Sequence, residues 1–95
     1  MRAQQRTIQT CCGGVNIILK TDRPVLPDDI NKLVGLGFKE AVHFTKSGIL
    51  YVDNPDLIIT GPLGSDRLQV KCKIRDNNVC EQKIKDFEVL LQQLG

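Results

Sequence analysis

The most regular pattern in the chain is an alternation of apolar and polar positions over residues 67–75. Apolar side chains occupy every second position, and all but one of the intervening residues are basic. Successive side chains of a β-strand point to opposite faces, so this pattern predicts a strand with one core face and one cationic face. The apolar positions are Leu68, Val70, Cys72 and Ile74.

Three further segments are rich in β-branched and aliphatic residues and are predicted as strands: 15–20, 49–52 and 57–60. Their apolar residues fall on both faces, which favours interior strands. Residues 38–46 also alternate, with Phe38, Val42 and Phe44 on one parity. This segment is predicted as a fifth strand, joined to 49–52 by a turn at Gly48.

Two segments have helical periodicity. Proline at 27 and two following aspartates predict a helix start, and Gly37 predicts its end. Asn78, with Glu81 three residues later, resembles a capping box at the start of a second helix. Apolar residues there step by three and four, which predicts one buried stripe over about four turns. The stripe consists of Cys80, Ile84, Phe87, Leu91 and Leu94.

The element order β-α-β-β-β-β-α predicts an α+β fold. We expect a mostly antiparallel sheet of four to five strands, with both helices packed on one face to bury their apolar stripes. Residues 15–95 are predicted to form one domain, since 95 residues are too few for two. Residues 1–14 are predicted to be either a flexible tail or an edge strand.

Composition narrows the function classes only slightly. Thirteen basic and eleven acidic residues give a net charge of +2, below the strong positive charge typical of nucleic-acid domains. No apolar run approaches the roughly 18 residues of a membrane span, and the N-terminus lacks the apolar segment of a secretory signal. We therefore expect a cytoplasmic protein without membrane contact, with its thiols reduced.

The cysteines and the single histidine suggest no strong site. Cys72 and Cys80 fall on predicted core positions, where free cysteine acts as a small hydrophobe. Adjacent Cys11 and Cys12 are candidates for a reactive thiol, which requires a lowered pKa. Together with His43 these residues supply enough ligands for zinc, but the usual paired Cys-x-x-Cys spacing is absent. We expect no metal and no cofactor.

No catalytic residue is predicted either. His43 is expected to face solvent, and no Gly-x-Ser-x-Gly elbow supplies a nucleophile. The glycine-containing loop 61–66 lacks the Gly-Lys-Ser/Thr ending of a phosphate loop and precedes a strand rather than a helix.

The leading hypothesis is a non-catalytic protein-interaction or regulatory accessory module. Two helices on one face would leave the other face of two-sided apolar strands exposed, unless residues 1–14 fold across it. Large apolar patches mark interaction sites, so we expect docking to a protein partner or homodimerisation through the sheet. Leu50, Tyr51 and Ile58 are the residues expected at this surface.

The alternative hypothesis is a nucleic-acid-binding domain. Its contacts to phosphates would come from Arg67, Lys71, Lys73 and Arg75, with Lys39 or Lys46 joining if their strands are neighbours. Single-strand binders usually add aromatic platforms to such a face, and here only Tyr51 is available. A solvated outer face, or an edge strand protected by its charges, explains the same pattern without a ligand.

Overall fold

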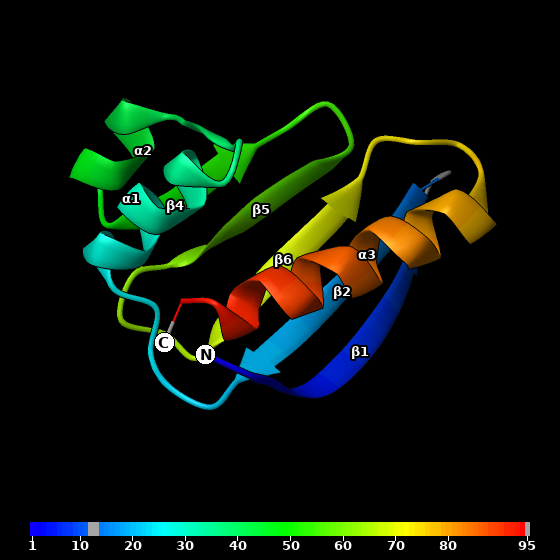
Figure 1. The fold of residues 1–95 in the computed structure, drawn as a ribbon, viewed down its shortest axis with the longest axis horizontal. Coiled ribbons are helices and arrows are strands. Elements are labelled where there is room, and N and C mark those ends of the chain that lie inside the picture. Colours follow the sequence, from blue (N-terminus) through cyan, green and yellow to red (C-terminus); the bar gives the residue numbers. More distant parts are fainter. Residues whose placement is uncertain (12–13, 95) are drawn as a thin grey trace.

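A computed structural model of the chain shows an α+β fold with one antiparallel sheet (Figure 1). It describes the backbone of residues 1–11 and 14–94 and the side chains of residues 1–8 and 16–94. The strands are β1 (Ala3–Cys11), β2 (Gly14–Thr21), β3 (Lys39–Glu40), β4 (Ile49–Asp53), β5 (Leu57–Pro62) and β6 (Arg67–Cys72). The helices are α1 (Pro27–Gly35), α2 (Val42–Lys46) and α3 (Asn77–Gln92).

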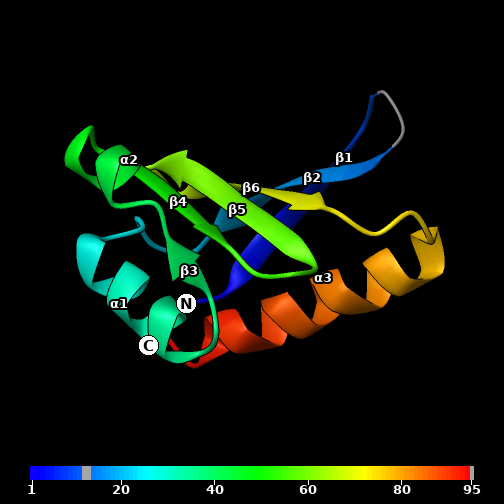
Figure 2. The same cartoon turned by 90° about the horizontal axis from the view of Figure 1, so that it is seen from above.

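The strands lie in the order β1-β2-β6-β5-β4-β3, and each neighbouring pair is antiparallel. The antiparallel α+β prediction is confirmed, whereas the described residues form six strands and three helices rather than four to five strands and two helices. Figure 2 shows α1 and α3 on one side of the sheet. α2 lies on the opposite side, near β4. Within the described residues, no helix is long and apolar enough to cross a membrane.

The core lies between the sheet and the pair α1 and α3. One row of directly opposed side chains runs across four strands and is wholly buried: Ile17, Val70, Ile59 and Val52. A shift of one residue would turn each strand's apolar set outward, so burial of this row fixes the register.

The start of α3 differs from its predicted cap. The carboxylate of Asp76 accepts hydrogen bonds from the backbone N–H groups of Asn78 and Val79, at 2.9 and 3.2 Å. Asp76 is therefore the N-cap, because a short side chain with extended backbone can reach the free N–H groups of the first turn. The predicted stripe is confirmed, since all five of its apolar residues are buried.

The predicted end of α1 is confirmed in detail. Gly37 adopts a φ of 107°, and the N–H of Phe38 donates to the carbonyl of Leu33 at 3.2 Å. Both apolar side chains are buried, which completes the hydrophobic contact of a Schellman motif.

The predicted strand over 38–46 is wrong. Only Lys39 and Glu40 pair with β4, and the chain then forms the single turn of α2. The Thr45 hydroxyl donates to the Glu40 carboxylate at 2.7 Å, and the ring of Phe44 stacks on Tyr51. These contacts stabilise the helical turn of α2. The alternation over 38–46 does not predict this turn, because a short apolar pattern fits a strand or a helix.

The prediction that Cys72 and Cys80 are free thiols is also wrong, because they form a disulfide. Cys72 ends β6 on its core side, and Cys80 lies on the core side of the first turn of α3. Their Cα atoms are 5.9 Å apart, within the range that a disulfide spans. Cytoplasmic proteins usually keep their thiols reduced, so the disulfide disagrees with the expectation of reduced cysteines. The cytoplasmic location itself stays a prediction.

Candidate interaction surface

The sheet has one face that α1 and α3 leave uncovered, which we call the open face (Figure 2). Its side chains alternate along each strand with those of the core, as the pleat requires. Across the four inner strands the open face includes Asn16, Ile18 and Lys20 of β2, Tyr51 and Asp53 of β4, Ile58 and Thr60 of β5, and Arg67, Gln69 and Lys71 of β6.

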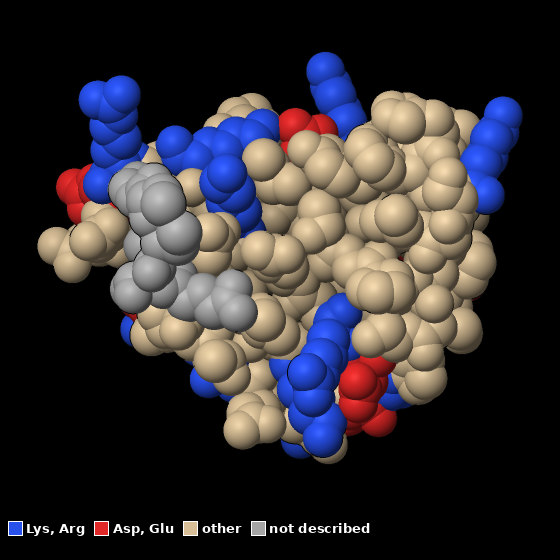
Figure 3. Space-filling model, turned by 180° about the vertical axis from the view of Figure 1, so that it is seen from behind, with Lys and Arg blue, Asp and Glu red and all other residues tan. Residues whose placement is uncertain are grey.

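Cross-strand pairing arranges these side chains in rows. One row joins Ile18, Gln69, Thr60 and Tyr51, and the next joins Asn16, Lys71, Ile58 and Asp53. Aliphatic and aromatic groups are therefore interspersed with polar ones across the face. Figure 3 shows it as a largely uncharged surface with Lys and Arg side chains toward its margins.

Two of the three predicted interaction residues belong to the open face. Tyr51 and Ile58 are half-buried there. Leu50 is wholly buried in the core on the opposite side of β4, so it is not available to a partner. Neighbouring residues of one strand cannot share a face, which separates Leu50 from Tyr51.

An aromatic stack closes the β4 end of the open face. The rings of Phe44 and Tyr51 lie 4.9 Å apart at their centroids and 14° from parallel, and His43 contacts Phe44 at 4.3 Å. His43 is exposed, as expected. One side of the Tyr51 ring is thus occupied by Phe44 and is not free to stack on a nucleobase.

The four predicted nucleic-acid-binding residues do not form one group. Arg67 and Lys71 are exposed on the open face, while Arg75 is exposed in the loop before α3. Lys73 follows the end of β6, and its ammonium group donates to the Asp53 carboxylate and to the Asn54 carbonyl, both at 2.8 Å. Lys73 is therefore engaged within the chain.

Lys20 is a cation of this face that the sequence pattern did not indicate. It lies on β2 directly opposite Arg67, because β2 pairs with β6. The two residues, with Gln5, Thr7 and Ile18, line a hollow of about 290 Å³ on the open face. Lys20 could be found only from the pairing of β2 with β6, which are distant in sequence. Periodicity within one segment does not predict such a pairing.

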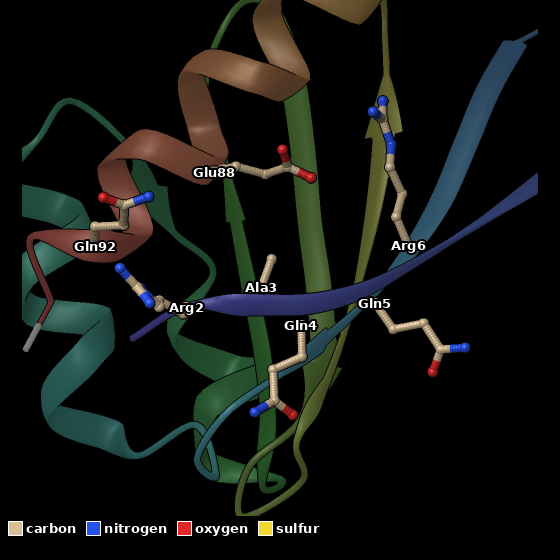
Figure 4. Close-up of a pocket in the computed structure, with 7 residues that line it drawn as sticks. All are labelled: Arg2, Ala3, Gln4, Gln5, Arg6, Glu88 and Gln92. Atoms are coloured by element: carbon tan, nitrogen blue, oxygen red, sulfur yellow. The ribbon is translucent and has the colours of Figure 1, made fainter.

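A second hollow, of about 360 Å³, lies between β1 and the C-terminal half of α3 (Figure 4). Its lining is polar on both sides and includes Gln4 and Gln5 of β1 with Glu88 and Gln92 of α3. Arg6 reaches from β1 to α3, where its guanidinium donates two hydrogen bonds to the Glu81 carboxylate, at 2.7 and 2.8 Å. These hydrogen bonds lower the pKa of Glu81 from its ordinary value.

Among the residues that the structure describes, no three His, Cys, Asp or Glu side chains gather where they would hold a metal ion. The prediction of reactive thiols at Cys11 and Cys12 concerns side chains outside the described residues.

Comparison with known proteins adds no assignment to this geometry. The chain matches no protein-family model, no curated protein and no solved structure.

Proposed function

We propose that this chain is a non-catalytic protein-interaction module that docks a partner protein on its open face. The observation that carries the proposal is the position of Ile18, Tyr51 and Ile58 on a sheet face where no helix of the described residues covers β2, β5 and β6. Uncovered aliphatic and aromatic groups with a polar surround are typical of surfaces that bind protein.

Charge indicates the kind of partner. Lys20, Arg67 and Lys71 are exposed on the open face, and the acid on the same face, Asp53, is paired with Lys73. A partner surface with an apolar centre and acidic residues at its rim complements this arrangement, because opposite charges at a rim steer association and set orientation.

The test places a photo-crosslinking residue at Ile18 and, as a control, at Val89, which is exposed on α3 on the helix side. We expect protein adducts from the Ile18 position and not from Val89. Adding Ile58→Glu should abolish those adducts, because it buries a charge in the centre of the interface. Adducts that persist with Ile58→Glu, or that form equally from Val89, would contradict docking on the open face.

Nucleic-acid binding is the second candidate, favoured by Lys20 lying directly opposite Arg67 with Lys71 on the same face. Three cations on one sheet face can follow a phosphate backbone. Two features weigh against it: Lys73 is paired with Asp53, and Phe44 occupies one side of the Tyr51 ring.

A further inference from the structure

The two edges of the sheet differ in how they are protected. β3 has only two residues and continues directly into α2. β1 has nine residues and, among the described strands, pairs with β2 alone (Figure 1). An edge strand directs alternate N–H and C=O groups away from the sheet, where another strand can pair with them.

β1 lacks most of the features that prevent such pairing. It contains no proline and no lysine, and its single charged residue is Arg6. The Arg6 side chain is held against α3 by its two hydrogen bonds to Glu81. A bulge between Ala3 and Gln5 bends the start of the strand, but from Gln5 to Cys11 the register with β2 is unbroken.

An exposed isoleucine lies at the centre of this regular stretch. Ile8 has three residues on each side within Gln5 to Cys11. Its relative exposure of 62% is the highest of the exposed large hydrophobic side chains in the described chain. α3 packs against β2 and β6 and leaves the outer edge of β1 accessible.

We propose that two copies of this chain associate through β1, antiparallel, about a two-fold axis at Ile8. All seven residues from Gln5 to Cys11 then find a partner, since the axis lies at their centre. Ile8 meets Ile8 of the second copy, and Arg6 lies opposite Thr10 of the second copy, so no like charges oppose each other. The two six-stranded sheets become one continuous sheet.

A second copy fits this edge because the pairing is self-complementary, as a two-fold interface requires. Directly opposed residues of an antiparallel pair share a face, so both open faces lie on the same side of the dimer and stay uncovered. The dimer is therefore independent of docking on the open face.

The test is the mass in solution by light scattering behind size exclusion, over a range of concentrations. We expect the wild type to have twice the chain mass of 10.6 kDa, and Ile8→Lys to have the single-chain mass. Lysine at an edge opposes strand addition, and here two lysines would meet at the axis. The control is Val42→Lys, which replaces another exposed aliphatic residue, on α2, and should stay dimeric.

Hydrogen exchange on the wild type gives a second readout that does not depend on a variant folding. Alternate amide protons of β1 should exchange more slowly as concentration rises, while those of β3 should not change. A wild type that is monomeric at the highest attainable concentration would overturn the proposal. A dimer that survives Ile8→Lys but is lost in Ile58→Glu would also overturn it and would assign association to the open face.

Discussion

At the scale of single residues, the most constrained polar group is the carboxylate of Asp29, which is 2% exposed. Arg23 donates two hydrogen bonds to it, at 2.7 and 2.9 Å, and the backbone N–H of Leu26 donates a third at 2.9 Å. Burial alone would raise the pKa of Asp29, but these donors outweigh burial and lower it below its ordinary value. Arg23 also donates to the carbonyl of Leu94, which ties the start of α1 to the C-terminal segment.

Replacing Arg23 with alanine should reduce the free energy of unfolding by about 2 kcal/mol, because it leaves a buried carboxylate without its charged donor. The wild-type stabilisation should be complete above the ordinary pKa of Asp29, 3.8, and decline as pH falls through its lower folded pKa. Urea unfolding from acid to neutral pH measures both effects. Arg75→Ala, at an exposed loop arginine, is the control, and equal losses in the two variants would refute the assignment.

Gly61 gives a second residue-scale prediction, because a Cβ atom there would lie 2.7 Å from the backbone oxygen of Arg67. Gly61→Ala should therefore separate β5 from β6 locally and lower the unfolding free energy by about 1–3 kcal/mol. The control is Gly35→Ala, where an added Cβ meets nothing within 4 Å. That helical substitution should be neutral or stabilising. Thermal unfolding compares the two, and a Gly61→Ala protein as stable as the wild type would contradict the close approach.

At the scale of elements, prediction succeeded where the apolar pattern was regular and failed where a contact between elements decides the structure. The stripe of α3 and the alternation of β6 each leave one consistent solution, so both elements followed from the sequence. The segment 38–46 did not, because stacking of Phe44 on Tyr51 decides its structure, and that contact joins different elements. The disulfide was missed for a related reason. Cys72 and Cys80 were both placed on core positions, but their distance depends on how α3 crosses β6.

The disulfide is expected to stabilise the junction of β6 and α3. It closes a short loop, with a sequence separation of 8, so its loss should cost about 2–3 kcal/mol through the entropy of the unfolded chain. The double variant Cys72→Ala/Cys80→Ala should show this loss in chemical unfolding. A reducing agent should destabilise the wild type to a similar extent and leave the double variant unchanged. Reduction that has no effect on wild-type stability would contradict a structural role.

At the scale of the whole molecule, the sheet order decides which charges act together. The sequence placed four cations along 67–75, but the fold leaves Arg67 and Lys71 on the open face, pairs Lys73 with Asp53, and adds Lys20 from β2. Pairing of β2 with β6 brings together residues about 50 positions apart, which local pattern cannot reveal. The sequence therefore predicted an uncovered sheet face but only some of the residues on it: Tyr51 and Ile58 lie there, whereas Leu50 is buried.

Reversing the two opposed cations, Lys20→Glu with Arg67→Glu, separates the two candidate functions. If the open face docks an acidic protein surface, the Ile18 crosslinks should be lost in this variant, and wild-type protein should not bind oligonucleotides even at low salt. Binding measured by fluorescence anisotropy would instead favour nucleic acid. The affinity for the oligonucleotide should then fall as the salt concentration rises. This dependence should be weaker in the double variant, because a protein that makes fewer phosphate contacts releases fewer counterions. Arg75→Glu with Lys85→Glu changes the net charge equally away from the open face and should match the wild type in both assays. A loss of binding in that control as well would show that net charge, rather than the pairing of Lys20 with Arg67, determines what this face attracts.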